Sequence, residues 1–181
     1  LRPADFHNLT EAAGRIYEAP LFIDDTPNIK LLDLRAQARR MKSKEDIKAL
    51  FIDYIGLIEP ENKMNVPRHE QVAEISRSIK SFARELQIPI ICLSQVGRQS
   101  EGKPPTLADL RESGSIEQDA DVVLFLHRER EDSRDSRDGH SSGNVETDLV
   151  VAKQRNGPVG TVKLAFLPSY TKFESFSNEK P

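Results

Sequence analysis

Cysteine, tryptophan and long apolar runs are scarce or missing in this chain of 181 residues. The single cysteine, Cys92, has no partner for a disulfide within the chain, which fits a reducing compartment. No apolar run approaches the roughly 20 residues that a membrane-spanning helix needs. Residues 1–11 have neither the apolar centre nor the small-residue cleavage site of a secretory signal. We therefore expect a cytoplasmic protein with no membrane partner.

An excess of positive charge is also missing. Lys and Arg number 26 against 29 Asp and Glu, for a net charge of −3. This balance excludes a generally basic coat for nucleic acid, so DNA binding would depend on a local cluster or on a few basic groups repeated by symmetry. The histidines, the cysteine and the carboxylates show no spacing typical of a metal cage.

A complete phosphate-binding loop is a further absence. The segment "GRQSEGKP" at residues 97–104 has Walker A spacing up to Lys103, but residue 104 is proline where the loop needs a hydroxyl for Mg²⁺. Pro105 follows, and two consecutive prolines favour a rigid extended linker over a helix. We interpret this segment as a loop and not as a phosphate site.

Four short apolar runs predict buried parallel strands, because their apolar residues are continuous rather than alternating. The runs lie at residues 20–24, 49–57, 88–95 and 121–128. Two helical patterns fall between them, with apolar faces at Leu31, Leu34, Ala38 and Met41, and at Val72, Ile75, Ile79, Phe82 and Leu86. Strands that alternate with helices predict an α/β fold with a mostly parallel sheet.

The last third of the chain predicts a C-terminal β-hairpin. Two strand-like segments, residues 145–155 and 159–166, flank the dipeptide Asn156-Gly157, which is a strong hairpin signal. Pro158 follows this turn directly. It should delay the start of the second strand or place that strand at an edge.

Two polar stretches predict loops. Residues 59–67 contain two prolines, and residues 128–144 are charged and of low complexity. A segment with the second composition cannot bury a core, so we expect residues 128–144 to form a mobile loop.

The first candidate site residue is Asp53, which ends the apolar run that begins at residue 49. Open α/β sheets bind ligands at the carboxyl ends of their strands, and a Walker B aspartate lies there to hold the Mg²⁺ of a bound nucleotide. An aspartate that only caps a strand gives the same pattern. Asp24 and Asp25 match it equally well, although Thr26-Pro27 indicates that they lead into the next helix.

The second candidate is Gln95, at the end of the run 88–95. Its amide both donates and accepts hydrogen bonds, so it can sense a γ-phosphate or orient an attacking water. Taken alone, a glutamine here is more often an ordinary polar strand end.

Four longer segments resemble the DnaB family of bacterial replicative DNA helicases. They are "LFIDYIGLI", "EISRSIKSFARELQIPIICLSQ", "DLRESGSIEQDADVVLFLHRE" and "KQRNGPVGTVKLAF", and the similarity runs from Glu11 to Phe173. The resemblance implies a RecA-like P-loop NTPase core that uses ATP and Mg²⁺. It also implies a homohexameric ring around single-stranded DNA, with a primase and a helicase loader as partners.

The resemblance assigns roles to individual residues. Asp53 would be the Walker B metal residue and Gln95 the nucleotide sensor, while Lys153 and Arg155 would reach the γ-phosphate of the neighbouring subunit. The last two residues lie two positions apart just before a tight turn, a placement that projects Arg155 for phosphoryl transfer. The alternative is a hairpin decorated with basic residues.

The same resemblance predicts a DNA-facing loop formed by Arg111, Glu112, Ser113 and Gly114. Gly114 permits close approach of the backbone, and Arg111 supplies one positive charge per subunit. The segment also fits a helix N-terminus, because Ser115 and Gln118 have the spacing of a capping box.

The chain departs from the family pattern ahead of Asp53, where the family's phosphate loop and catalytic glutamate are not found. The family's N-terminal helical domain is missing too. We therefore expect residues 1–181 to be a partial ATPase domain, truncated before the Walker B strand region and inactive alone, from an ATP-dependent DNA helicase. Two alternatives stay open: a RecA/RadA-type recombination ATPase, and a non-catalytic binding module on a decayed ATPase core.

Overall fold

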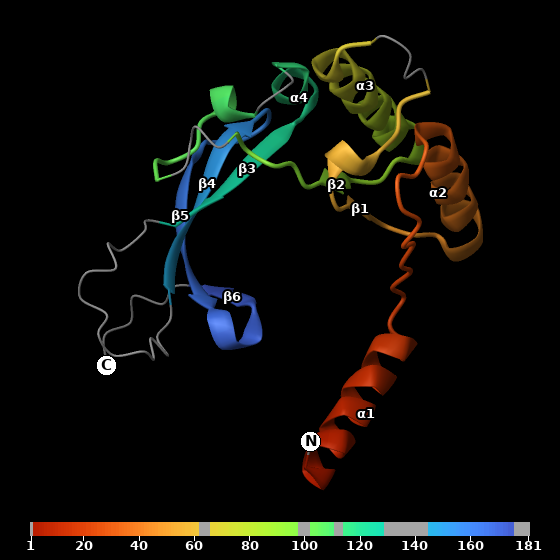
Figure 1. Ribbon diagram of the computed structural model, residues 1–181, viewed down its shortest axis with the longest axis vertical. Coiled ribbons are helices and arrows are strands. Elements are labelled where there is room, and N and C mark those ends of the chain that lie inside the picture. The colour runs from red at the N-terminus through yellow and green to blue at the C-terminus, as the bar shows by residue number, and fades with distance from the viewer. Residues whose placement is uncertain (1, 62–65, 98–101, 111–113, 129–144, 176–181) are drawn as a thin grey trace.

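The computed structural model describes residues 2–61, 66–97, 102–110, 114–128 and 145–175. The helices and strands follow the order α1 (Pro3–Glu18), α2 (Leu31–Glu45), β1 (Leu50–Ile52), α3 (Arg68–Leu86), β2 (Ile90–Cys92), α4 (Gly114–Asp119), β3 (Val122–His127), β4 (Val145–Gln154), β5 (Gly160–Leu167) and β6 (Lys172–Ser175). Short 3₁₀ helices are η1 (Ile55–Leu57), η3 (Leu107–Asp109) and η4 (Pro168–Tyr170). Figure 1 shows α2 and α3 beside β1 and β2, a long twisted sheet, and α1 standing apart.

The first part is the parallel unit, made of α2, α3, β1 and β2. β1 and β2 run parallel, with Leu50 opposite Ile90 and Ile52 opposite Cys92. α3 connects the two strands in the chain, and Ile75 of α3 packs in one core cluster with Ile52 of β1 and with α2. A strand, a helix and a parallel strand in this order confirm the α/β prediction for this part of the chain.

Helix α3 forms because its apolar residues recur at three- and four-residue intervals, which places them on one face. That face is buried, and Ile75 and Phe82 are 0% and 2% exposed. Fully burying one such side chain stabilises the fold by roughly 1.5–3 kcal/mol. The helix ends at Leu86, and Gln87 takes the left-handed conformation with φ 53°.

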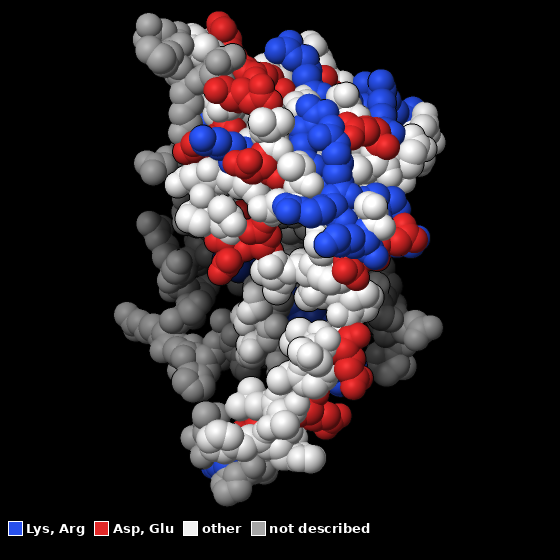
Figure 2. Space-filling view, turned by 90° about the vertical axis from the view of Figure 1, so that its right-hand side faces the viewer, with Lys and Arg blue, Asp and Glu red and all other residues white. Residues whose placement is uncertain are grey.

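Ion pairs on the surface hold α2 against α3. Figure 2 looks onto this side and shows lysine and arginine side chains gathered in a band, with acidic residues beside it. Arg35 and Arg39 of α2 both pair with Glu85 of α3, and their guanidinium carbons lie 5.5 and 5.6 Å from the centroid of the Phe82 ring. Part of the positive charge is therefore neutralised within the fold.

The second part is the antiparallel unit, made of α4 and the sheet β3–β4–β5–β6. The predicted hairpin is confirmed as β4 and β5, but its loop covers residues 155–159 and pairing resumes with Val151 opposite Gly160. Pro158 lies in this loop and has no N–H for a ladder hydrogen bond, which accounts for the late start of β5. The alternative outcome, an edge position for the second strand, does not occur, because β5 lies between β4 and β6.

The prediction of a parallel strand is wrong for two of the four apolar runs. Residues 21–24 have no regular secondary structure and pair with no strand among the described residues, so they form no sheet. Residues 122–127 do form a strand, β3, but it is antiparallel to β4. Burial alternates along β3, with Val123 and Phe125 buried and Leu124 exposed. A continuous apolar run predicts a strand, whereas its partner and direction depend on segments distant in sequence.

Two further predictions concern the loop at residues 128–144 and membrane-spanning helices. The predicted mobile loop at 128–144 lies outside them, apart from Arg128. Within the parts of the chain that the structure covers, no helix combines the length and apolar character that crossing a bilayer requires.

Candidate nucleotide-binding site

Asp53 and Gln95 lie where the carboxyl ends of two adjacent parallel strands meet. The pairing of β1 and β2 continues past both strands, because Leu93 N–H donates to the Ile52 carbonyl at 2.9 Å and Ile55 N–H donates to the Leu93 carbonyl at 3.0 Å. Asp53 follows Ile52 directly, and Gln95 comes two residues after Leu93. The structure therefore brings the two predicted residues to the same rim of the parallel unit.

Both rim side chains are open to solvent. Among the described residues no hydrogen bond or ion pair involves the Asp53 carboxylate or the Gln95 amide. The Asp53–Tyr54 peptide bond is cis. Exposed carboxylate and amide groups at the end of a parallel sheet fit a nucleotide with Mg²⁺, since Mg²⁺ takes one or two carboxylates together with phosphate oxygens and waters.

The rest of the described chain offers no competing metal or thiol chemistry. No grouping of three or more histidine, cysteine and carboxylate side chains occurs among the described residues. Cys92 lies on β2, and burial raises the pKa of its thiol to about 11. The thiol is therefore protonated at neutral pH, which supports a packing role.

The segment with the Walker A spacing is only partly described, and its described residues, Gly97 and residues 102–104, lie in no helix or strand. Gly97 is buried and its N–H donates to the Asp109 carbonyl at 3.0 Å. Residues 98–101 lie outside the described residues, and Gly102 has φ +81°. The next described element is the 3₁₀ helix η3, so no α-helix begins where a phosphate loop requires one.

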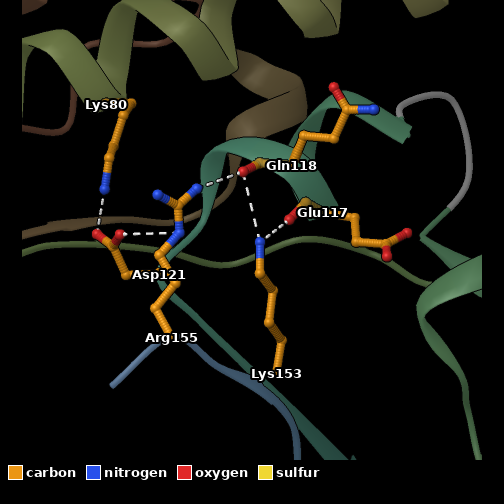
Figure 3. A network of polar contacts seen from close by, with 6 residues as sticks. All are labelled: Lys80, Glu117, Gln118, Asp121, Lys153 and Arg155. Atoms are coloured by element: carbon orange, nitrogen blue, oxygen red, sulfur yellow. Dashed lines mark hydrogen bonds and ion pairs between the residues drawn. The ribbon is translucent and has the colours of Figure 1, made fainter.

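Lys153 and Arg155 lie at the hairpin and point toward α4 of their own chain, as Figure 3 shows. Lys153 Nζ donates to the Glu117 carbonyl and, at 3.4 Å, to the Gln118 carbonyl. Arg155 Nη2 donates to the Gln118 carbonyl at 2.9 Å. Lys153 lies on β4 and Arg155 is the first residue after it, and the side chains of both reach carbonyls of α4.

Two residues that the sequence did not single out complete this network. Asp121 Oδ1 lies 3.6 Å from Arg155 Nε, and the Asp121 carboxylate also pairs with Lys80 of α3. The hydrogen bond from Lys80 is the main reason that the pKa of Asp121 lies below its usual value. Lys80 and Asp121 are 41 residues apart, and no local pattern connects them.

Three residues of the predicted DNA-facing loop, Arg111, Glu112 and Ser113, lie outside the described residues. Gly114 is the first residue of α4, and a Cβ added there would meet nothing within 4 Å. The expected capping box is wrong, because the helix begins at Gly114 and Ser115 therefore lies inside it.

Two parallel strands connected by a helix, with polar side chains at the carboxyl ends of both strands, fit an α/β core of the RecA-like class. The chain belongs to the DnaB-like helicase C-terminal domain family, which it matches over residues 1–175. It is 56% identical over 173 residues to the replicative DNA helicase DnaB of Treponema pallidum, and 47% identical over 176 residues to that of Geobacillus stearothermophilus. Each match covers 96% of this chain and 36% or 38% of the relative, so the chain spans little more than a third of those proteins.

Solved structures agree with this assignment. One solved ATPase domain has a TM-score of 0.81 and 38% identity to this chain, covering 96% of this chain and 61% of that one. A DnaB-like replicative helicase, solved to show its interactions with primase, has a TM-score of 0.81 and 36% identity over 98% of this chain and 42% of that one. The RecA-like fold expected from the resemblance is thereby confirmed.

Proposed function

We propose that the protein carrying this chain is an ATP-dependent replicative DNA helicase that works as a homohexameric ring on single-stranded DNA in the cytoplasm. The observation that carries the proposal is the meeting of Asp53 and Gln95 at one rim of a parallel sheet, in a chain of the DnaB-like family. The solved structure of a DnaB-like replicative helicase and its interactions with primase supports primase as a partner. A helicase loader is proposed on the family resemblance alone.

The two rim residues would act on the nucleotide in different ways. Asp53 would hold Mg²⁺, which when bound offsets the charge of the β- and γ-phosphates. Gln95 would orient the attacking water or report the presence of the γ-phosphate, because its amide can donate and accept at once. Both side chains are exposed, so a nucleotide can reach them without displacing a contact described within this chain.

Lys153 and Arg155 would act on the nucleotide of the neighbouring subunit. Lys153 lies on β4 of the antiparallel sheet and Arg155 follows it, whereas Asp53 and Gln95 follow the parallel strands. Among the described residues, no hydrogen bond or ion pair joins the two pairs. The Arg155 side chain is 48% exposed, so part of its guanidinium can reach a second chain. A guanidinium that meets the γ-phosphate stabilises the charge of the transition state.

Residues 111–114 would face the DNA backbone. Gly114 supports this role because the space around its Cα is open, so that a phosphate could approach the chain closely. Arg111 would then contribute one charge per subunit, and DNA affinity should fall with salt accordingly.

The test is ATP hydrolysis and unwinding of a forked duplex by the full-length protein and its Asp53→Ala variant. Without the carboxylate, hydrolysis should fall by at least about 100-fold, the loss typical of removing one transition-state contact. Asp25→Ala is the matched control, because it also removes an aspartate after an apolar run but lies away from the parallel pair. Normal hydrolysis by Asp53→Ala, or strand exchange without unwinding by the parent, would overturn the proposal.

A further inference from the structure

Arg155 is held on two sides by its own chain. Its Nη2 donates to the Gln118 carbonyl at 2.9 Å, and its Nε faces Asp121 Oδ1 at 3.6 Å. The backbone adds a third contact, in which Arg155 N–H donates to the Asp121 carbonyl at 2.9 Å. One hydrogen bond and one ion pair therefore restrict the orientation of a long flexible side chain, while part of its guanidinium remains exposed.

Lys80 and Arg155 interact unequally with the Asp121 carboxylate. Lys80 makes the shorter contact to the carboxylate, and its side chain is 20% exposed against 48% for Arg155. The hydrogen bond from Lys80 is the largest cause of the lowered pKa of Asp121, and the charge of Arg155 contributes less. The charge of Arg84 also acts on Asp121, so cations outnumber the carboxylate here, and Arg155 is the more exposed of the two cations that pair with it.

Side chains of α3 also contact the end of α4 and the residue pair that follows it. Ser76 of α3 is buried, and its hydroxyl donates to Asp119 Oδ2 at 2.7 Å. Lys80 lies one helical turn further along α3, so both contacts arise from one face of that helix. The parallel unit therefore supplies the support from which Asp121 and the Gln118 carbonyl hold Arg155 (Figure 3).

We propose that Asp121 and Lys80 are positioning residues for the trans-acting Arg155: Asp121 orients the guanidinium, and Lys80 prevents Asp121 from neutralising it. This inference rests on the proposed function, because it needs a γ-phosphate on the neighbouring subunit as the target. Neither residue touches the nucleotide. Their effect is to hold Arg155 in one position beside α4, with the exposed part of its guanidinium available to a second chain.

The proposal predicts an unusual order of effects in the full-length protein. Asp121→Asn removes the orientation alone, so kcat for ATP should fall by about ten-fold with little change in nucleotide affinity. Lys80→Gln leaves Arg155 as the remaining ion-pair partner of the Asp121 carboxylate. The carboxylate then holds Arg155 away from the neighbouring nucleotide, and kcat should fall by about 100-fold. The double variant should recover to the level of Asp121→Asn, about ten-fold above Lys80→Gln, because no carboxylate is left to capture Arg155.

This recovery separates positioning from a structural role. If the ion pair only stabilised the fold, the double variant would hydrolyse ATP no faster than Lys80→Gln, and that result would overturn the proposal. Asp121→Glu keeps the charge and should restore most of the lost kcat. Binding of a fluorescent ATP analogue and the thermal midpoint, measured for every variant, show whether a loss of kcat arises from affinity or unfolding.

Two controls make the outcome decisive. Lys172→Gln and Glu174→Gln break an ion pair of the same kind on β6, away from α4, and should leave kcat unchanged. Arg155→Ala sets the floor, and Asp121→Asn in that background should have no further effect. Full activity in Arg155→Ala would refute the finger and this inference together, whereas an inactive Arg155→Ala beside a fully active Asp121→Asn would refute the inference alone.

Discussion

The two sheets of this protein present their candidate site residues in opposite ways. In the parallel unit the core is closed around Ile75 and Phe82, while Asp53 and Gln95 are exposed at its rim. In the antiparallel unit one face of β3 stays exposed, with Leu124 53% accessible, while Lys153 is engaged with α4 of the same chain. The parallel unit presents exposed polar side chains at the rim of a packed core, whereas the antiparallel unit holds its cations in hydrogen bonds and ion pairs.

This difference fits two roles in one reaction. A metal-binding carboxylate needs only the right strand end and solvent access, which the parallel unit supplies. A residue that must act on another subunit needs a defined direction before the partner arrives, because free rotation of a long side chain costs rate. The contacts from α3 to Asp119 and Asp121 connect the two units, so the packed one supports the other.

The largest effect concerns the phosphates themselves. Neither unit contains the loop of backbone N–H groups, the lysine and the hydroxyl that hold the β- and γ-phosphates, so this chain of 181 residues should show no measurable ATP hydrolysis alone. Phosphate release by the purified chain is the measurement. Hydrolysis that Asp53→Ala abolishes would show that the rim is sufficient and that the expectation is wrong.

The next-largest effect concerns Arg155, which we propose reaches the γ-phosphate of the neighbouring subunit. Arg155→Ala in the full-length protein should lower ATP hydrolysis by about 10³-fold, while nucleotide affinity changes only a few-fold. Mixing this variant with a subunit that lacks its phosphate-loop lysine tests the direction of action. If Arg155 works across the interface, some mixed rings pair an intact site with an intact finger and regain activity. Mixed rings confirmed by mass spectrometry that stay inactive at every ratio would place Arg155 in its own site or outside catalysis.

A smaller effect, on the free energy of unfolding, distinguishes the buried core of the parallel unit from the exposed face of β3. Phe82→Ala should lower the free energy of unfolding by about 3–5 kcal/mol, since the ring is buried beneath two arginines of α2 and leaves a cavity. Leu124→Ala on the exposed face of β3 should change it by less than about 0.5 kcal/mol. Urea denaturation of the purified chain measures both. A comparable loss for Leu124→Ala would show that the open face of β3 is covered in solution.

The smallest effect is on the pH dependence of stability. Hydrogen bonds from Arg39 and Arg35 lower the pKa of Glu85 from 4.5 to about 2. A lowered pKa stabilises the folded state above the unfolded value, and this contribution is lost as the pH falls from 4.5 towards 2. Glu85→Gln should therefore be slightly less stable than the parent at pH 7, and the gap should close in acid. A gap that widens between pH 5 and pH 3 would contradict this assignment.

Local patterns predicted the parts of the molecule whose structure depends on nearby residues. The helix periodicity from Val72 to Leu86 predicted α3, and Asn156-Gly157 predicted the hairpin, although Pro158 lengthened its loop. Asp53 and Gln95 were predicted because each ends an apolar run, and the carboxyl ends of adjacent parallel strands always meet on one side of the sheet. These residues remain candidates whose roles await the experiments above.

The sequence specified helix faces, strand positions and the family, since these follow from side-chain periodicity and from motifs in a fixed order. Only the tertiary structure decided which strands pair: β3 joins β4 in the antiparallel sheet, and residues 21–24 join no sheet among the described residues. It also brought Lys80 to Asp121, and Arg155 to both Asp121 and Gln118. Strand partners and charge networks depend on contacts between residues tens of positions apart, which spacing along the chain does not encode.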